Sequence, residues 1–320
     1  MSVLIFLDQA DGHIRKASLE AANYGAAIAT QLGTTAEAIV LGTITEELTS
    51  LGKYGITTIH TVADASLNQM DAQVCTKIIA QAATALGATV IVFSNNIVGK
   101  AVAPRLSVRL KAGLVTGAVA LPNITNGFTV KKSVFSGKAF AHVQINTAIK
   151  IITLNANAYS IVTTSNTATV SPFAAAIDTA LITVTGVTKV EGDVPLIEAE
   201  IVVSGGRGLK GPENWHLVTD LAKLLGAATA CSRPVADIHW RPHHEHVGQT
   251  GIAIAPNLYI AIGISGAIQH LAGVNRSKTI VVINKDAEAP FFKAADYGIV
   301  GDAFEVMPKI IEAVKKLKSA

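Results

Sequence analysis

The residues that could do chemistry in this chain gather in turns that follow short apolar runs in its second half. Three such turns come after the runs at residues 199–204, 226–230 and 258–263: Gly205-Gly206-Arg207-Gly208, Ser232-Arg233 and Gly263-Ile264-Ser265-Gly266. A turn of this kind at the start of a helix presents free backbone N–H groups, which attract an anion, phosphate above all. An arginine in the turn adds a charge-assisted hydrogen bond to the same anion. The turns predict a site for a phosphate-bearing group, although small residues chosen for close packing would leave the same pattern.

The first of these turns also matches a nucleotide-binding fingerprint. Residues 206–211 fit the pattern G-x-G-x-x-G between a predicted strand at 199–204 and a predicted helix at 215–225. Taken alone, this pattern indicates a dinucleotide site. The helix begins only after Pro212, later than the fingerprint requires, so a dinucleotide site and an ordinary glycine turn both stay open.

Other polar residues are expected at the same edge of the sheet. Open parallel sheets bind ligands outside the carboxyl ends of their strands. Strands predicted at 278–284 and 297–300 end near Asn284 and Asp302, and a polar turn, Gly248-Gln249-Thr250, precedes the third apolar run. We expect these groups to collect with Arg207, Ser232 and Arg233 there. Asn284 and Asp302 could bind ribose or adenine, or could simply cap turns.

Four histidines stand close together before the polar turn, at His239, His243, His244 and His246. Imidazole is a common ligand of transition metals. No cysteine ligand and no second cluster stands nearby in the sequence to complete a coordination shell. We therefore expect no metal site.

Composition limits the class of protein. The chain has 320 residues, of which 50% are hydrophobic and 15% charged. This length favours two domains, and apolar content dominated by Ala, Val, Ile and Leu is typical of buried parallel strands covered by helices. No apolar run approaches the ~20 residues of a membrane-spanning helix, and the net charge of +3 forms no nucleic-acid-binding stripe. Two cysteines, Cys75 and Cys231, exclude a disulfide framework and fit a reducing cytoplasm.

The first 190 residues predict a scaffold domain. Strand patterns at 3–7, 36–41, 57–62 and 88–93 alternate with helix patterns at 16–32, 71–86 and 100–111, which predicts a parallel sheet. Runs at 114–121, 127–135, 139–146 and 150–154 predict an antiparallel extension of that sheet, and the Thr/Ser-rich residues 160–171 predict an exposed loop. The charged stretch 189–200 places the domain boundary at 190/191. Residues 1–190 hold no cluster typical of catalysis, so we expect a partner-interaction domain there and the site in residues 191–320.

Together, the motifs resemble the alpha subunit of electron transfer flavoproteins. The resemblance spans residues 197–310 and rests on the series 204–208, 232–233, 247–251, 255–259, 263–270, 283–286 and 295–298. It implies an α/β protein of two domains, each a mostly parallel sheet flanked by helices, the second a Rossmann-like FAD-binding domain. Two positions depart from the family pattern. His246 stands where Gln is common, and Ile252 stands where Lys or Arg is common.

The resemblance also implies a function. The chain would pair with a beta subunit, hold FAD in its C-terminal domain, accept electrons from flavin dehydrogenases such as the acyl-CoA dehydrogenases of fatty acid beta-oxidation, and pass them to a quinone oxidoreductase. Such a protein is an electron carrier rather than an enzyme, because the cofactor supplies the chemistry. The alternatives are an NAD-linked dehydrogenase that uses the Gly206–Gly211 loop and an interaction module without a cofactor. Whether the beta subunit holds AMP or a second FAD depends on the other chain.

The family match implies roles for individual residues. Arg233 would lie over the isoalloxazine ring, Thr250 near N5 and His270 near the carbonyl O2, so that these three would tune the flavin, and no residue would be catalytic. The implied cofactor-binding residues are Arg207, Ser232, Arg233, Val247, Gly248, Gln249, Thr250, Ser265, Gly266, Ala267, Ile268, Gln269, His270, Asn284, Asp302 and Ala303.

Overall fold

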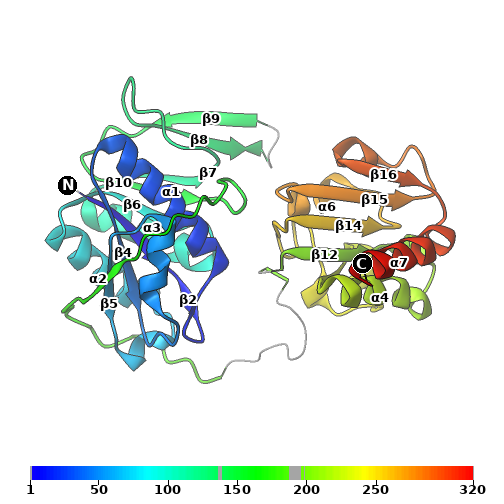
Figure 1. The fold of residues 1–320 in the computed structure, drawn as a ribbon, viewed down its shortest axis with the longest axis horizontal. Coiled ribbons are helices and arrows are strands. Elements are labelled where there is room, and N and C mark those ends of the chain that lie inside the picture. Colours follow the sequence, from blue (N-terminus) through cyan, green and yellow to red (C-terminus); the bar gives the residue numbers. More distant parts are fainter. Residues whose placement is uncertain (1, 136–138, 187–195, 198, 320) are drawn as a thin grey trace. The chain divides into compact units, whose positions relative to one another are not determined.

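The chain forms two compact units. The computed structural model describes residues 2–135, 139–186, 196–197 and 199–319. The first unit is Met1–Val187 and the second is Thr188–Ala320 (Figure 1). The boundary predicted at 190/191 lies outside the described residues, and the roles predicted for the two domains stay predictions.

The first unit is built on a nine-stranded sheet. Its strands, in order across the sheet, are β11 (Thr169–Pro172), β5 (Thr58–Val62), β4 (Thr35–Leu41), β1 (Ser2–Leu7), β6 (Ala88–Ser94), β10 (Lys150–Leu154), β7 (Gly113–Ala118), β8 (Thr129–Val134) and β9 (Ala139–Gln144). The first seven run parallel to one another, and β8 is antiparallel to both β7 and β9. A separate small hairpin joins β2 (Gln9–Ala10) to β3 (His13–Ile14).

Helices cover both faces of this sheet. All six residues of β1 are buried. Because successive side chains of a strand point to opposite faces, Val3 and Ile5 join one core, with α1 (Lys16–Leu32). Leu4 joins the other core, with α2 (Ala72–Ala85) and α3 (Ile97–Leu110). A central strand buried on both faces explains the continuous apolar run at the start of the sequence.

Two expectations about the first unit were wrong. The run at 150–154 is not part of an antiparallel extension, because β10 lies between β6 and β7 and is parallel to both. Four of its five residues are buried, as is usual for a central parallel strand. The segment 160–171 is not entirely loop, because β11 begins at Thr169 and pairs in parallel with β5. The run at 114–121 forms β7, which is parallel to β10 and antiparallel to β8, so the antiparallel prediction holds only for the pairings of β7 with β8 and of β8 with β9.

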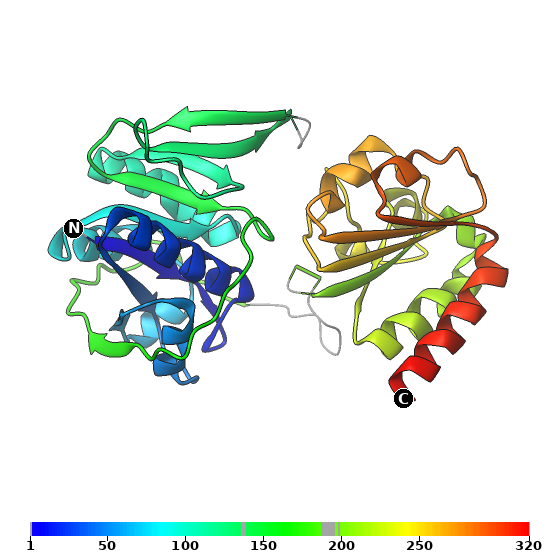
Figure 2. The ribbon, with the colours of Figure 1, turned by 45° about the horizontal axis from the view of Figure 1, so that its top comes forward.

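The second unit is a five-stranded parallel sheet. The order is β13 (Ala228–Cys231), β12 (Ile201–Gly205), β14 (Leu258–Ile262), β15 (Thr279–Asn284) and β16 (Tyr297–Val300). Val203 and Ile262 share a core with α4 (His216–Leu225), α5 (Arg233–Asp237) and α7 (Ala303–Ser319). Tyr259 and Ala261 share the opposite core with α6 (Ile268–Val274) and the turn η7 (Pro290–Ala294). Helices α4 and α7 lie side by side on one face (Figure 2).

The architecture confirms the predicted fold class, two mostly parallel sheets flanked by helices. Among the described residues, no helix combines the length and the apolar character that a bilayer crossing demands. Cys75 and Cys231 are buried free thiols.

Candidate functional site

The strand order of the second sheet creates a point where two loops start side by side. The chain passes from β12 to β13 on one side, and β14 then lies on the other side of β12. The connections after β12 and β14 therefore leave the same edge of the sheet and diverge. This is a topological switch point, the usual ligand-binding position of open α/β sheets.

Glycines bring the backbones of these two loops into contact. The N–H of Gly206 donates to the carbonyl of Ile262 over 2.9 Å, and the N–H of Gly208 donates to that of Gly263 over 3.1 Å. A Cβ on Gly206 would lie 2.2 Å from the Gly263 oxygen, and Gly263 itself has a φ of +63°. Only glycine fits such an approach. The exposed side chain of Arg207 extends from the middle of the contact.

The polar turn at 247–251 is fixed at both ends. The N–H of Val247 donates to the Cys231 carbonyl at the end of β13 (3.1 Å), and that of Gln249 donates to the Gln269 carbonyl in the first turn of α6 (2.7 Å). Gln249 and Thr250 are exposed, whereas Val247 is buried. The turn therefore presents its polar side chains at the carboxyl edge of the sheet.

The segment that leads into α6 presents small and polar residues. Ser265, Ala267 and Gln269 are exposed, as is the larger apolar side chain of Ile268. Gly266 has a φ of +80°, and a Cβ there would lie 2.4 Å from Phe291. The N–H groups in the first turn of a helix have no intrahelical acceptor, so this segment offers donors for an anion beside the Gly206–Gly208 loop.

Arg233 lies at the end of β13 as predicted, in an ion pair within its own helix. Ser232 is the N-cap residue of α5, and Arg233 is its first residue. The Nε of Arg233 lies 3.3 Å from a carboxylate oxygen of Asp237, with the side chains 62% and 50% exposed. An exposed pair of this kind contributes at most about 1 kcal/mol, so the guanidinium can leave Asp237 for a bound group.

Asn284 and Asp302 both have capping roles. The amide of Asn284 donates to the Ile264 carbonyl over 3.0 Å, and its oxygen accepts from the N–H of Asp286 over 3.0 Å. Asp302 accepts from the N–H of Phe304 over 3.0 Å at the start of α7. These bonds hold the turns in place, and a further role of either residue toward a cofactor stays a prediction, as does that of the buried Ala303.

His270 is buried behind the exposed first turn of α6. Its Nε2 lies 2.8 Å from the hydroxyl of Tyr259, a residue of β14. Among the described residues, no acceptor lies in hydrogen-bonding geometry with its Nδ1. Burial, reinforced by nearby His246, lowers the pKa of His270 to about 4. The imidazole is therefore neutral near pH 7 and keeps one ring nitrogen for another partner.

The histidine-rich segment is organised by an ion pair. Arg241 donates from Nε to Glu245 over 2.9 Å, makes a second bond to the same carboxylate, and lies over the Trp215 ring at 5.5 Å. His239 and His243 lie with ring centroids 6.4 Å apart. In the parts of the chain that the structure describes, no three His, Cys, Asp or Glu side chains are grouped to hold a metal ion.

His246, one of the two unusual positions, packs inside the polar turn. It is buried, and a Cβ on Gly251 would lie 2.9 Å from its Cγ. Burial, together with Arg233 and His243, lowers its pKa, against the opposing effect of Asp237. Ile252 is half-buried and pairs in a bridge with Val247. The two unusual residues therefore support the turn from its inner side.

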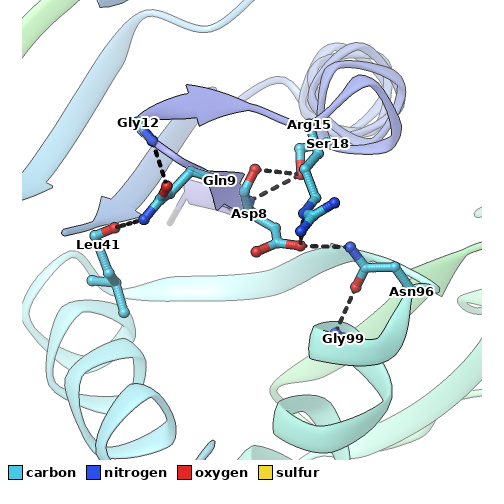
Figure 3. Close-up of polar contacts among 8 residues, drawn as sticks. All are labelled: Asp8, Gln9, Gly12, Arg15, Ser18, Leu41, Asn96 and Gly99. Carbon is cyan, nitrogen blue, oxygen red and sulfur yellow. Dashed lines mark hydrogen bonds and ion pairs between the residues drawn. The ribbon is translucent and has the colours of Figure 1, made fainter. Parts of the chain in front are cut away.

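The carboxyl edge of the first sheet differs from that of the second. Asp8, at the end of β1, accepts from the Nδ2 of Asn96 over 2.7 Å and pairs with the Nε of Arg15 at 3.3 Å (Figure 3). Asn96 also caps α3 by accepting from the N–H of Gly99 over 2.9 Å. These polar groups bond to one another and tie the ends of α1 and α3 to β1. The second sheet instead presents exposed Arg207, Gln249 and Ser265 at its edge.

Comparison with known proteins decides the family. Residues 3–208 match the family model described as the electron transfer flavoprotein domain, and residues 195–275 match that of the electron transfer flavoprotein FAD-binding domain. The chain is 36% identical over 316 residues to the electron transfer flavoprotein subunit alpha of Syntrophomonas wolfei, covering 98% of both chains. It is 35% identical over 324 residues to that of Bacillus subtilis, again covering 98% of both.

The chain belongs to the electron transfer flavoprotein alpha-subunit family. A third relative, the subunit alpha of Paracoccus denitrificans, is 42% identical over 212 residues, which are 66% of this chain and 68% of that one. The match to the FAD-binding domain confirms FAD as the cofactor expected at the level of the family. Members of the family are electron carriers, and an alpha subunit implies a beta subunit as its partner.

The geometry brings together most of the residues that the resemblance implied for this electron transfer flavoprotein subunit. Those after β12, β13, β14 and β15 lie at one edge because the strands are parallel. Their individual contacts to FAD stay predictions. Sequence reasoning missed Tyr259, because a tyrosine in an apolar strand has the pattern of a core residue. Its hydroxyl is recognisable only once the fold places it against His270.

Proposed function

We propose that this chain is the alpha subunit of a heterodimeric electron transfer flavoprotein that holds FAD at the carboxyl edge of its second sheet. The observation that carries the proposal is the contact between the Gly206–Gly208 loop and Gly263 at the switch point, within a region that matches the FAD-binding domain. FAD, when bound, accepts and releases electrons, and the chain binds it, orients it and sets its electrostatic surroundings.

The residues at this edge fit such a cofactor. The glycine contact lets an anion approach two backbones at once, and Arg207 adds a positive charge beside them. Three side chains then act on the flavin ring. Arg233 supplies a cation, Thr250 a polar group and His270 a neutral N–H donor. Donors and cations fixed in advance favour reduced flavin, which carries more negative charge.

We also propose the electron partners and the location. The donors are flavin dehydrogenases such as acyl-CoA dehydrogenases, and the acceptor is a quinone oxidoreductase. The protein is a carrier without a substrate of its own. A cytoplasmic location fits its two unpaired thiols.

The alternative is an NAD-linked dehydrogenase that uses the Gly206–Gly211 loop. Against it, α4 begins only at His216, after the two short turns η4 (Arg207–Leu209) and η5 (Pro212–Trp215). A dinucleotide fingerprint needs the helix to begin within the glycine loop. The glycines of this loop are instead explained by their contact with Gly263.

A visible absorption spectrum of the chain co-expressed with its beta subunit tests the proposal. Bound oxidised flavin gives a yellow protein, which the proposal predicts, and reduced acyl-CoA dehydrogenase should bleach it. A colourless protein that binds NAD would favour the dehydrogenase, and a colourless protein that binds neither would favour an interaction module.

A further inference from the structure

Three buried rings lie directly behind the candidate flavin site. Tyr259 of β14, His270 of α6 and Phe291 of η7 have ring centroids 5.7 to 6.2 Å apart. Tyr259 and Phe291 are fully buried, and His270 is 7% exposed. The hydrogen bond of 2.8 Å between the Tyr259 hydroxyl and Nε2 of His270 is thus shielded from water. A shielded bond of this kind fixes the ring that it holds.

The direction of this hydrogen bond follows from its surroundings. Burial raises the pKa of the Tyr259 hydroxyl, so the group keeps its proton. Ser204 is the other nearby side chain, and it lowers the pKa of Tyr259 against the effect of burial, as a donor to the Tyr259 oxygen would. Its Oγ has no acceptor or donor in normal hydrogen-bonding geometry among the described residues. The Tyr259 proton therefore has one acceptor, Nε2 of His270. A neutral histidine that accepts at Nε2 carries its own proton on Nδ1.

Among the described residues, no acceptor lies in hydrogen-bonding geometry with that Nδ1–H group. It is buried, and the backbone of Val247, which lies beside the ring, raises the pKa of His270 only as the smallest of the effects on it. An unsatisfied buried donor costs about 1–3 kcal/mol. Such a cost at the junction of α6 and the 247–251 turn indicates an acceptor supplied by a bound group. The titratable groups around the pair are His246 and, on β13, the thiol of Cys231.

We propose that Tyr259 is a positioning residue, which acts through His270 by holding its imidazole as a neutral Nδ1–H donor for the flavin. This inference rests on the proposed function. Tyr259 itself does not touch the cofactor, because it lies fully buried in β14. Its hydroxyl selects which ring nitrogen of His270 carries the proton. The donor is then a neutral N–H group rather than a cation.

The tautomer can be measured directly. Imidazole ¹⁵N NMR on the heterodimer, with and without FAD, should show His270 protonated at Nδ1 and unprotonated at Nε2. In Tyr259→Phe, Nε2 loses its donor, and the Nε2–H form should become populated. The matched control is Tyr24→Phe in the first unit, because Tyr24 is equally buried and donates to the Ala120 carbonyl over 2.9 Å. This control should leave the His270 signals unchanged.

The flavin potential tests whether the tautomer matters. Losing one neutral hydrogen bond that favours reduced flavin should shift the equilibrium between oxidised and reduced flavin roughly two- to tenfold. A tenfold shift corresponds to about 59 mV for one electron. Tyr259→Phe should lower the potential within that range. His270→Asn keeps an N–H donor near the place of Nδ1, so adding Tyr259→Phe to this variant should cause no further shift.

Each outcome supports or overturns the inference. Wild-type His270 protonated at Nε2 overturns it, as does a Tyr259→Phe shift that persists in the His270→Asn background, because Tyr259 would then act without His270. A heterodimer that binds no FAD overturns the proposed function and the donor role together. In that case the NMR measurement still reports separately whether Tyr259 sets the tautomer.

Discussion

The guanidinium Nε of Arg233 lies 3.3 Å from the carboxylate of Asp237, one turn further along the same short helix. The cation stands at the N-terminal end of α5 and the anion at its C-terminal end, which is the unfavourable order for the helix dipole. The pair is also exposed and therefore weak. Asp237 thus acts as a resting partner for an arginine that is free to turn toward a cofactor.

Removing the charge of Arg233 should lower the first-electron potential of the flavin. A unit charge at ~4 Å contributes on the order of 4 kcal/mol at an effective dielectric near 20. Screening by solvent and Asp237 should reduce this to roughly 1–3 kcal/mol, a drop of about 40–130 mV at 59 mV per tenfold. Arg233→Lys should keep part of the effect. Spectroelectrochemical titration of Arg233→Ala measures it, and an unchanged potential would leave Arg233 with a structural role only.

Neutralising Asp237 should raise the first-electron potential of the flavin, the opposite of the effect of removing the Arg233 charge. Asp237→Asn removes the competing anion, so the potential should rise by roughly 20–40 mV for a screened charge. The control is Glu312→Gln, because Glu312 forms a similarly spaced pair with Lys316 on α7 at 2.7 Å. The control should not move the potential. A lower potential in Asp237→Asn would show that the carboxylate does not oppose the effect of the Arg233 charge on the flavin.

Arg207→Ala should weaken FAD retention more than it shifts the potential. Arg207 is exposed within the glycine contact, where we assign it to the phosphates. Losing one charge-assisted bond should cost about 1.5–3 kcal/mol, roughly 10- to 150-fold in affinity. Equilibrium FAD binding measures the loss, with Lys223→Ala on α4 as an exposed cation control. Unchanged affinity with a shifted potential would instead place Arg207 at the ring.

Gly206→Ala should destabilise the second unit. The new Cβ would lie 2.2 Å from the Gly263 carbonyl oxygen, and backbone cannot move aside as a flexible side chain can. Overpacking of this kind costs about 1–3 kcal/mol. Gly186→Ala, where nothing lies within 4 Å of the added Cβ, is the matched control. Chemical denaturation compares the two, and equal midpoints would contradict the close contact.

The buried His270 should make the second unit sensitive to acid. Its pKa is about 4 in the folded protein and about 6.5 when unfolded, so only the unfolded state takes up its proton between these values. The contribution to the free energy of unfolding is thus full above pH ~6.5 and falls by up to about 3 kcal/mol as pH drops to ~4. His270→Asn should flatten this slope. Identical pH profiles for the two proteins would contradict the burial of His270.

How much the sequence could predict depends on the range of the interactions involved. The helix predicted at 16–32 forms over the same residues as α1, because its apolar spacing and the left-handed Gly33 after it are local signals. The glycine turns were found for the same reason. The direction of β10 was not predicted correctly, because a five-residue strand between turns has no local feature that indicates which strands it pairs with. Tyr259 and His270 are 11 positions apart, and only the tertiary fold joins them.

The dependence on a partner also has a direct test. We expect an obligate heterodimer with the beta subunit, since obligate interfaces are large and apolar. The first unit carries exposed apolar side chains such as Val162, Phe140 and Leu181. Expressed alone, the chain should be aggregated or poor in FAD by light scattering and absorbance. A monodisperse, FAD-replete monomer would contradict this expectation.

The most direct test of the central claim, that the second unit of this chain holds FAD, is the FAD content of the purified heterodimer. The cofactor is released by heat and quantified by chromatography, and it should include one FAD per heterodimer that belongs to this chain, whatever the beta subunit carries. The FAD content should be lower in Arg207→Ala and unchanged in Lys223→Ala. A wild-type heterodimer without FAD, or FAD content equal in all three proteins after extensive dialysis, would contradict the site described at the carboxyl edge of the second sheet.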